Sequence, residues 1–214
     1  QNEDYYFVGL PLLSGRLHGK KKSLIRDIVK KYNLDLRLTP NQDILLCNIS
    51  YKHKLDIKKA LSKIGYENLN EINEIQRHAL ACPALPLCGL AMTEAERILP
   101  SVLTRIDDLI KSLNIKTSIL FRMTGCPNGC TRPYMAELAL VGSGQNKYQL
   151  WLGGSKNLQR LAKPYLQRMD LDDLEKTIKP LLIEWKECYS ESDFGDFINT
   201  KDEASIMNLL NEVK

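Results

Sequence analysis

Four cysteines in two closely spaced pairs constrain this sequence more than any other feature. Cys82 and Cys88 have five residues between them, Cys126 and Cys130 have three, and 37 residues separate the two pairs. Thiolate sulfur is the usual ligand of iron–sulfur clusters, in which each iron takes one soft protein ligand. The pattern therefore favours a cubane cluster held by two loops.

The residues around these cysteines suit such loops. Proline stiffens a loop, and glycine lets the backbone approach a cofactor closely. Residues of these two types lie next to or between the cysteines: Pro83, Pro86, Gly89, Gly125, Pro127 and Gly129. Both loops are expected to follow regular elements that fix the ligands in place.

Three alternatives for the four cysteines remain open at this point. Structural zinc sites use cysteine pairs with roughly two to four residues between them, which fits the second pair but not the first. Two disulfides are geometrically feasible, although the chain has no secretion signal and six cysteines in all. Buried inert thiols explain a single cysteine, and this is our interpretation of Cys47 and Cys188.

Composition places the chain among globular proteins. Hydrophobic residues make up 43% and charged residues 26%, enough to bury a core without disulfides. No run of about eighteen apolar residues is present, so we expect no transmembrane helix. The net charge is +4, but no aromatic residues are interleaved with the clusters of basic residues, which argues against a nucleic-acid partner.

In residues 1–70 the apolar residues recur at strand or helix spacing, and this pattern predicts a ferredoxin-like βαββα unit. A turn at 39–43 separates the second and third strands. The second strand should be half-buried because its leucines alternate with polar residues. The five expected elements are strands at 5–10, 34–38 and 44–49, and helices at 23–32 and 54–64.

We expect residues 71–200 to form a second, α/β unit that holds both cysteine pairs. Residues 201–214 are expected to form a polar C-terminal tail. Thr93 to Glu96 matches a helix-capping box, so a helix should begin near Met92 and break or restart at Pro100. The other expected elements are strands at 117–123, 136–141 and 148–152, a turn at 142–144, a helix at 171–188 restarted near residue 180, and a short helix at 206–213. The fold class is α+β.

With these features in view, a family resemblance becomes clear. The stretch Thr124 to Cys130, taken with Cys82 and Cys88, resembles the signature of siroheme-dependent sulfite and nitrite reductases. Thr131 to Leu138 resembles the ferredoxin-dependent sulfite reductases of plants, algae and cyanobacteria more closely than the nitrite enzymes. Further agreement lies at 38–42, 148–154 and 194–197, and the resemblance extends over roughly residues 5–200.

The resemblance implies a [4Fe–4S] cluster and a siroheme that share one cysteine thiolate. Cys130 maps to this bridging ligand, and Cys82, Cys88 and Cys126 map to the other cluster ligands. The remaining residues expected near the cofactors are Asn128 with its loop neighbours Pro127 and Gly129, then Asn41 and Gln42 near the macrocycle, and Arg132 near a siroheme carboxylate. For Asn41, Gln42 and Arg132, an ordinary turn or surface role is an equal alternative.

The resemblance also implies an activity, the six-electron reduction of sulfite to sulfide with ferredoxin as electron donor. The full enzymes contain a related N-terminal half that supplies most of the basic groups for sulfite and for the siroheme carboxylates. The sequence begins with Gln1 and without a starting Met, and its first residues are not expected to be a signal or transit peptide. We therefore expect an excised C-terminal half, or one part of a larger protein, that needs the missing N-terminal half and is inactive, or nearly so, alone.

Two other functions are alternatives. One is a fragment of a ferredoxin-dependent nitrite reductase, and the other is a non-catalytic iron–sulfur or zinc module. The expected location is the cyanobacterial cytoplasm or the plastid stroma.

Overall fold

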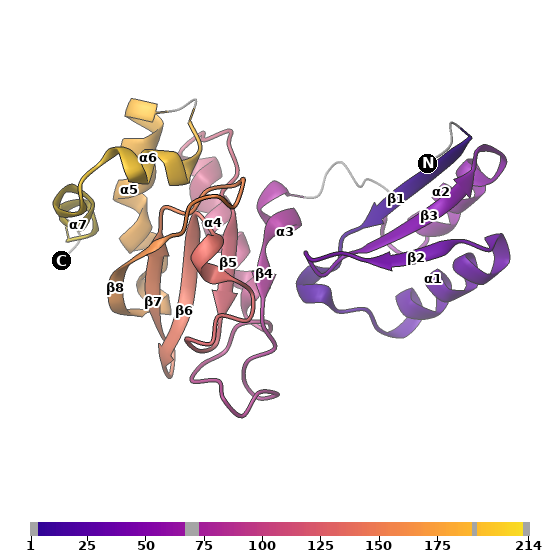
Figure 1. Cartoon of the computed structure of the whole chain (residues 1–214), viewed down its shortest axis with the longest axis horizontal. Helices are drawn as coiled ribbons and strands as arrows, with labels where there is room; N and C mark the ends of the chain where they lie inside the picture. Colours follow the sequence, from indigo (N-terminus) through magenta and orange to yellow (C-terminus); the bar gives the residue numbers. More distant parts are fainter. Residues whose placement is uncertain (1–3, 67–72, 190–191, 212–214) are drawn as a thin grey trace. The chain divides into compact units, whose positions relative to one another are not determined.

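The computed structural model describes residues 4–66, 73–189 and 192–211. The chain divides into two compact units, Gln1–Arg77 and His78–Lys214. Figure 1 shows that each unit combines a sheet with helices, which confirms the α+β fold class. The division falls after Arg77, whereas the sequence analysis sets the boundary after residue 70. No helix in the described part of the chain is long and apolar enough to cross a membrane.

The first unit has the expected βαββα order. Its sheet is antiparallel with β3 in the centre, in the order β1-β3-β2. The elements are β1 (Tyr5–Leu10), α1 (Gly19–Tyr32), β2 (Asp35–Leu38), β3 (Ile44–Ser50) and α2 (Lys54–Ser62), and a short helix α3 (Glu74–His78) lies at the division between the units.

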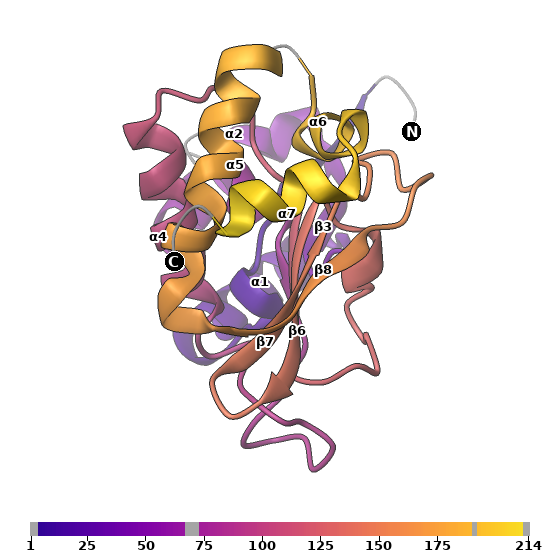
Figure 2. The ribbon, with the colours of Figure 1, turned by 90° about the vertical axis from the view of Figure 1, so that its left-hand side faces the viewer.

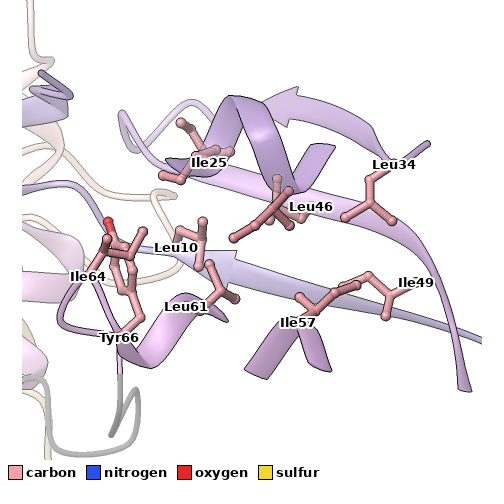
Figure 3. Packing of buried hydrophobic residues seen from close by; sticks show 11 residues of the cluster. Leu10, Ile25, Leu34, Leu46, Ile49, Ile57, Leu61, Ile64 and Tyr66 are labelled. Atoms are coloured by element: carbon pink, nitrogen blue, oxygen red, sulfur yellow. The ribbon is translucent and has the colours of Figure 1, made fainter. Parts of the chain in front are cut away.

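The core of the first unit lies between the sheet and its two helices. Figure 3 shows Leu10 and Leu46 of the sheet with Ile25 of α1 and Leu61 of α2. All of these side chains are buried. Tyr66 closes one end of this core, and its hydroxyl donates a hydrogen bond to the Pro11 carbonyl at 3.3 Å.

The prediction that the second strand is half-buried is wrong. All four residues of β2 are exposed, and Leu38 is 79% exposed. Leu36 pairs with Leu46, which is fully buried, so the two side chains share a face of the sheet. Alternation therefore identified the face correctly, but β2 is an edge strand, and periodicity does not show how far the covering helices extend.

The second unit is built on a mixed five-stranded sheet in the order β4-β5-β6-β7-β8. The first three strands are parallel and the last three are antiparallel. The strands are β4 (Leu80–Ala81), β5 (Phe121–Thr124), β6 (Leu138–Gly144), β7 (Lys147–Leu152) and β8 (Lys163–Asp170). The helices are α4 (Leu99–Ser112), α5 (Leu174–Tyr189), α6 (Phe194–Thr200) and α7 (Glu203–Asn211).

Helices α4 and α5 lie on one face of this sheet, as Figure 2 shows. Val102, Leu103 and Ile106 recur at helical spacing on α4, and none of them is exposed to solvent. Helix α7 packs on α5 and buries Ile206 and Leu210. The segment expected as a polar tail thus contributes apolar side chains to the core.

The expected helix start near Met92 is wrong. Helix α4 begins at Leu99 with Pro100 in its first turn, where a missing N–H costs nothing. The Thr93 hydroxyl, expected as a cap, instead donates to the Tyr148 hydroxyl at 3.0 Å. The backbone N–H groups of Met92 and Thr93 bind the Gly125 carbonyl, which holds this stretch out of the helix.

Other differences are local. Strand β5 begins at Phe121 rather than at residue 117, and β6 runs on to Gly144, so the tight turn before β7 contains Asn146 in place of the expected turn at 142–144. Pro180 lies inside a continuous α5. Neither β8 nor α6 was expected from the sequence.

Candidate metal centre

Both cysteine pairs begin at the carboxyl ends of two neighbouring parallel strands. Cys82 directly follows β4, and Cys126 comes two residues after the end of β5. The strands are in register, with Ala81 beside Met123, and the Cys82 N–H donates to the Met123 carbonyl at 3.3 Å. In Figure 1 the loop that follows β4 extends from the lower edge of the sheet. Ligand sites of open α/β sheets form at this end of the strands.

Gly125 joins the two cysteine loops. Its carbonyl accepts hydrogen bonds from the N–H groups of Met92 at 2.8 Å and Thr93 at 3.2 Å. A Cβ atom at this position would lie 2.6 Å from the Ala84 Cβ and 2.8 Å from the Thr93 carbonyl oxygen. The loops therefore approach each other at a distance that only glycine permits.

The four thiols differ in exposure. Cys82 and Cys126 are both 8% exposed, the Cys88 side chain is half-buried and that of Cys130 is exposed. Cys88 ends a tight turn in which its N–H donates to the Ala84 carbonyl at 2.8 Å. Cys130 is therefore the most accessible of the four thiols.

Groups from both cysteine loops influence the Cys82 thiol. Burial raises the pKa of Cys82, while hydrogen bonds from the backbone at Gly125 and Ala84 lower it and the charges of Cys130 and Cys126 raise it further. The Gly125 N–H donates to the Cys82 sulfur at 3.3 Å. Since Cys126 and Cys130 both act on Cys82, sulfurs from the two loops share one electrostatic neighbourhood.

Four thiols are a donor set that fits an iron–sulfur cluster. Across the described residues, no three His, Cys, Asp or Glu side chains converge on one position that could hold a metal ion. A cluster makes a different demand, because each thiolate binds a separate iron and the sulfurs surround the cofactor. Four thiols on two loops at one edge of the sheet meet that demand in number and chemistry.

Two threonines fasten the second cysteine loop to β5. The Thr124 hydroxyl donates to the Cys126 carbonyl at 3.1 Å, and the Thr131 hydroxyl donates to the Met123 carbonyl at 3.1 Å. Both side chains are buried. The loop thus leaves and rejoins the same strand end, which fixes the positions of its two cysteines.

The other expected site residues divide between the two units. Pro127, Asn128 and Arg132 are exposed, and Gly129 has a φ of +65° in the left-handed region. They are neighbours of Cys130 in the sequence, and their expected place near the cofactors stays a prediction. Asn41 and Gln42 form the turn between β2 and β3 of the first unit, and their expected approach to the macrocycle stays a prediction.

Sequence reasoning missed Arg122, a buried cation beside the second cysteine loop. Arg122 is 2% exposed, and its Nη1 donates to the Arg132 carbonyl at 3.0 Å. Burial and the positive charge of Arg132 lower the pKa of Arg122 to about 10. Its Nε has no hydrogen-bond partner among the described residues. No sequence signal distinguishes this arginine, because its burial depends on the packing of the loop.

Sequence reasoning also missed Tyr148, which anchors the stretch after the first cysteine pair. Its hydroxyl accepts a hydrogen bond from Thr93 at 3.0 Å and donates one to the Glu94 carbonyl at 2.7 Å. Burial, the largest cause, raises the pKa of Tyr148 to about 12. The tyrosine therefore remains a neutral donor and ties this stretch to β7.

The first unit matches a known family. Residues 1–64 match the nitrite/sulfite reductase ferredoxin-like half domain. The match covers β1 to α2, the part of the chain in which the βαββα order is found.

Curated relatives extend the similarity to nearly the whole chain. The ferredoxin sulfite reductase of Synechococcus elongatus is 44% identical over 203 residues, which are 92% of this chain and 32% of that protein. The NADPH sulfite reductase hemoprotein beta-component of Staphylococcus epidermidis is 40% identical over 179 residues, or 83% of this chain and 31% of that protein. The chain therefore spans about a third of the length of these relatives.

Two solved structures share the fold. The NirA protein of Mycobacterium tuberculosis matches with a TM-score of 0.77 at 20% identity, over 94% of this chain and 39% of that one. The dissimilatory sulfite reductase I structure matches with a TM-score of 0.69 at 10% identity, over 96% of this chain and 69% of that one. These two structures show the fold alone. Residues 1–64 belong to the nitrite/sulfite reductase ferredoxin-like half-domain family, and the sequence relatives extend the similarity to sulfite reductases over nearly the whole chain.

Proposed function

We propose that this chain is the cluster-bearing part of a sulfite reductase that reduces sulfite to sulfide with electrons from ferredoxin. One observation carries the proposal: both cysteine pairs start at the carboxyl ends of adjacent parallel strands, where Gly125 joins their loops. The 44% identity to a ferredoxin sulfite reductase supports the choice of substrate and donor. The name of the second relative, a hemoprotein, supports a haem-type group.

In this proposal Cys82, Cys88 and Cys126 hold three irons of a [4Fe–4S] cluster. Cys130 would hold the fourth iron and would also serve as the thiolate ligand shared with the siroheme. The exposed side chain of Cys130 supports this role, because a bridging ligand must face a second group outside its own loop. When bound, the two cofactors supply the redox chemistry, and the protein supplies position and electrostatics.

The chain's own residues would control the charge at this centre. The Gly125 N–H bond to the Cys82 sulfur stabilises the thiolate that a cluster requires. Arg132 lies exposed next to Cys130 and Thr131, where it can reach a carboxylate of the macrocycle. Arg122 places a second positive charge behind the same loop. Cations here offset the negative charge of thiolates and carboxylates.

Sulfite binding and turnover require more protein than this chain. Its relatives are about three times as long, and they differ in the electron donor that their names give, ferredoxin or NADPH. We therefore propose that a missing N-terminal half completes the siroheme and sulfite site. Asn41 and Gln42 of the first unit are proposed to approach the macrocycle there. Alone, the chain should reduce little or no sulfite.

Anaerobic reconstitution tests the cofactor assignment. The full chain would be supplied with iron, sulfide and siroheme, and its visible spectrum and its iron and acid-labile sulfide contents measured. We expect about four irons and four sulfides per chain. Cys82→Ser and Cys126→Ser should lose them, while Cys188→Ser, the matched control on an exposed cysteine at the end of α5, should keep them. A chain that binds zinc, or equal loss in the control, would contradict the assignment.

A nitrite reductase remains the second candidate for the substrate. The half-domain match covers both enzyme types by name. Once the chain is combined with a complementary half and reduced ferredoxin, sulfide should form from sulfite faster than ammonia forms from nitrite. The reverse order would favour the nitrite candidate.

A further inference from the structure

Tyr134 lies in the turn η4 (Pro133–Met135), four residues after Cys130. Its ring packs on Trp151 of β7, with the two ring centroids 4.5 Å apart and tilted by 59°. The Tyr134 carbonyl accepts a hydrogen bond from the Ala162 N–H at 2.7 Å, just before β8 begins. The residue is thus fixed to the sheet through both its ring and its backbone.

The other side of Tyr134 contacts the second cysteine loop at two points. Its hydroxyl donates to the Pro127 carbonyl at 2.6 Å. Gly129 packs directly on the ring, since a Cβ atom there would lie 2.7 Å from the Tyr134 Cε2. Burial and the charge of Cys126 raise the pKa of Tyr134, so the hydroxyl keeps its proton and remains a donor.

These contacts hold the part of the loop that β5 does not. The two ends of the loop are bonded to β5 through Thr124 and Thr131. Pro127 and Asn128, between the two cysteines, are exposed. Tyr134 therefore supports the middle of the loop, with one cysteine on each side of the supported stretch.

We propose that Tyr134 is a positioning residue for Cys126 and Cys130, acting through the Pro127 carbonyl and the Gly129 backbone. The inference rests on the proposed function, because the positioned thiolates matter only if they bind a cofactor. In this role the Tyr134 ring packs on Trp151 of β7 and thereby restricts the movement of the loop that carries the proposed bridging cysteine. Loss of the hydroxyl should loosen this loop and leave the rest of the unit intact.

Thiol alkylation of the full chain without added cofactors tests the positioning directly. Iodoacetamide labelling of each cysteine would be followed by mass spectrometry of the peptides in wild type and in Tyr134→Phe. Labelling of the buried Cys126 should become about fivefold faster in the variant, the effect of one lost hydrogen bond on local opening. Cys82 reports on opening of the whole second unit, and Cys47 reports on the first unit; both should react at unchanged rates.

Tyr165→Phe is the matched control, because it removes a half-buried tyrosine hydroxyl from β8 of the same unit. It should leave Cys126 labelling unchanged. Equal acceleration of Cys82 and Cys126 in Tyr134→Phe would mean general destabilisation and would overturn the proposal. No acceleration of Cys126 would overturn it as well.

The reconstituted chain provides a second readout that depends on the cofactor. Tyr134→Phe should still take up iron and sulfide, but the electron paramagnetic resonance spectrum of the reduced cluster and its midpoint potential should shift relative to wild type and to Tyr165→Phe. An unshifted spectrum and potential would count against the positioning role. If wild type itself binds no iron, the proposed function fails, whereas the alkylation result still decides whether Tyr134 positions the loop.

Discussion

Replacing Gly125 with alanine should separate the two cysteine loops. The added Cβ would lie 2.6 Å from the Ala84 Cβ and 2.8 Å from the Thr93 carbonyl oxygen, closer than such atoms can approach. Ala84 cannot easily retreat, because its own φ is 51° in the tight turn after Cys82. The clash can therefore be relieved only if the first loop moves away from Gly125. That movement disrupts the two hydrogen bonds that the Gly125 carbonyl accepts from Met92 and Thr93.

The cost follows from overpacking a buried contact. Such substitutions typically destabilise a protein by about 1–3 kcal/mol. In a unit of this size the loss lowers the melting temperature by roughly 3–10 °C. Movement of the first loop also takes Cys82 and Cys88 away from Cys126 and Cys130, so iron uptake on reconstitution should fall more than stability alone explains.

Tryptophan fluorescence is the assay, because both tryptophans, Trp151 and Trp185, belong to the second unit. Urea unfolding followed by this signal reports the free energy of that unit without contribution from the first. Gly89→Ala is the matched control: it lies next to Cys88, and its Cβ would meet no atom within 4 Å. If Gly125→Ala unfolds at the same urea concentration as Gly89→Ala and binds as much iron, the close approach of the loops is not required and the reasoning is refuted.

Further predictions concern the buried polar groups of the second unit. Glu137 is fully buried and accepts hydrogen bonds from the Leu120 and Gly195 N–H groups, each at 2.8 Å. Glu137→Ala leaves both donors unsatisfied and should lower the free energy of unfolding, measured by urea titration, by about 2–5 kcal/mol. A smaller loss would contradict the importance of these bonds. Burial raises the pKa of Glu137, so the folded protein holds this proton more tightly than the unfolded chain does. The stability of wild type relative to Glu137→Gln should therefore be greatest below about pH 4.5 and should fall as the pH rises through the raised pKa. A relative stability that increases with pH would contradict this prediction. Tyr148→Phe removes the bonds to Thr93 and Glu94 and should cost about 1–3 kcal/mol in the same assay, with Tyr165→Phe as the control that stays close to wild type.

The sequence predicted elements well where apolar periodicity and burial coincide. Helix α1 and strands β1 and β3 were found because their apolar residues face a covered core. Strand β8 was missed, since it is an exposed edge strand with charged residues and a proline near its start. Helix α6 was missed because it is short and contains Gly195, a residue that disfavours helices and is required here by its close contact with the Gly154 carbonyl.

The candidate site was predictable in its chemistry but not in its supports. Spacing and flanking residues singled out the four cysteines, because thiolate ligands must be cysteines in any fold; their role as cluster ligands stays a prediction. The residues that hold the loops include Tyr148 of β7, Arg122 of β5 and Tyr134 of η4, and their roles depend on tertiary packing. Thr93 shows the same limit: its local sequence matches a helix cap, and tertiary contact with Tyr148 decides otherwise.

The most direct test of the central claim is to locate iron in crystals of the reconstituted chain. Diffraction data collected on both sides of the iron absorption edge give an anomalous map that shows iron alone. The account predicts one compact iron peak surrounded by the sulfurs of Cys82, Cys88, Cys126 and Cys130. A peak at the zinc edge instead, or iron bound at Cys47 or Cys188, would contradict it.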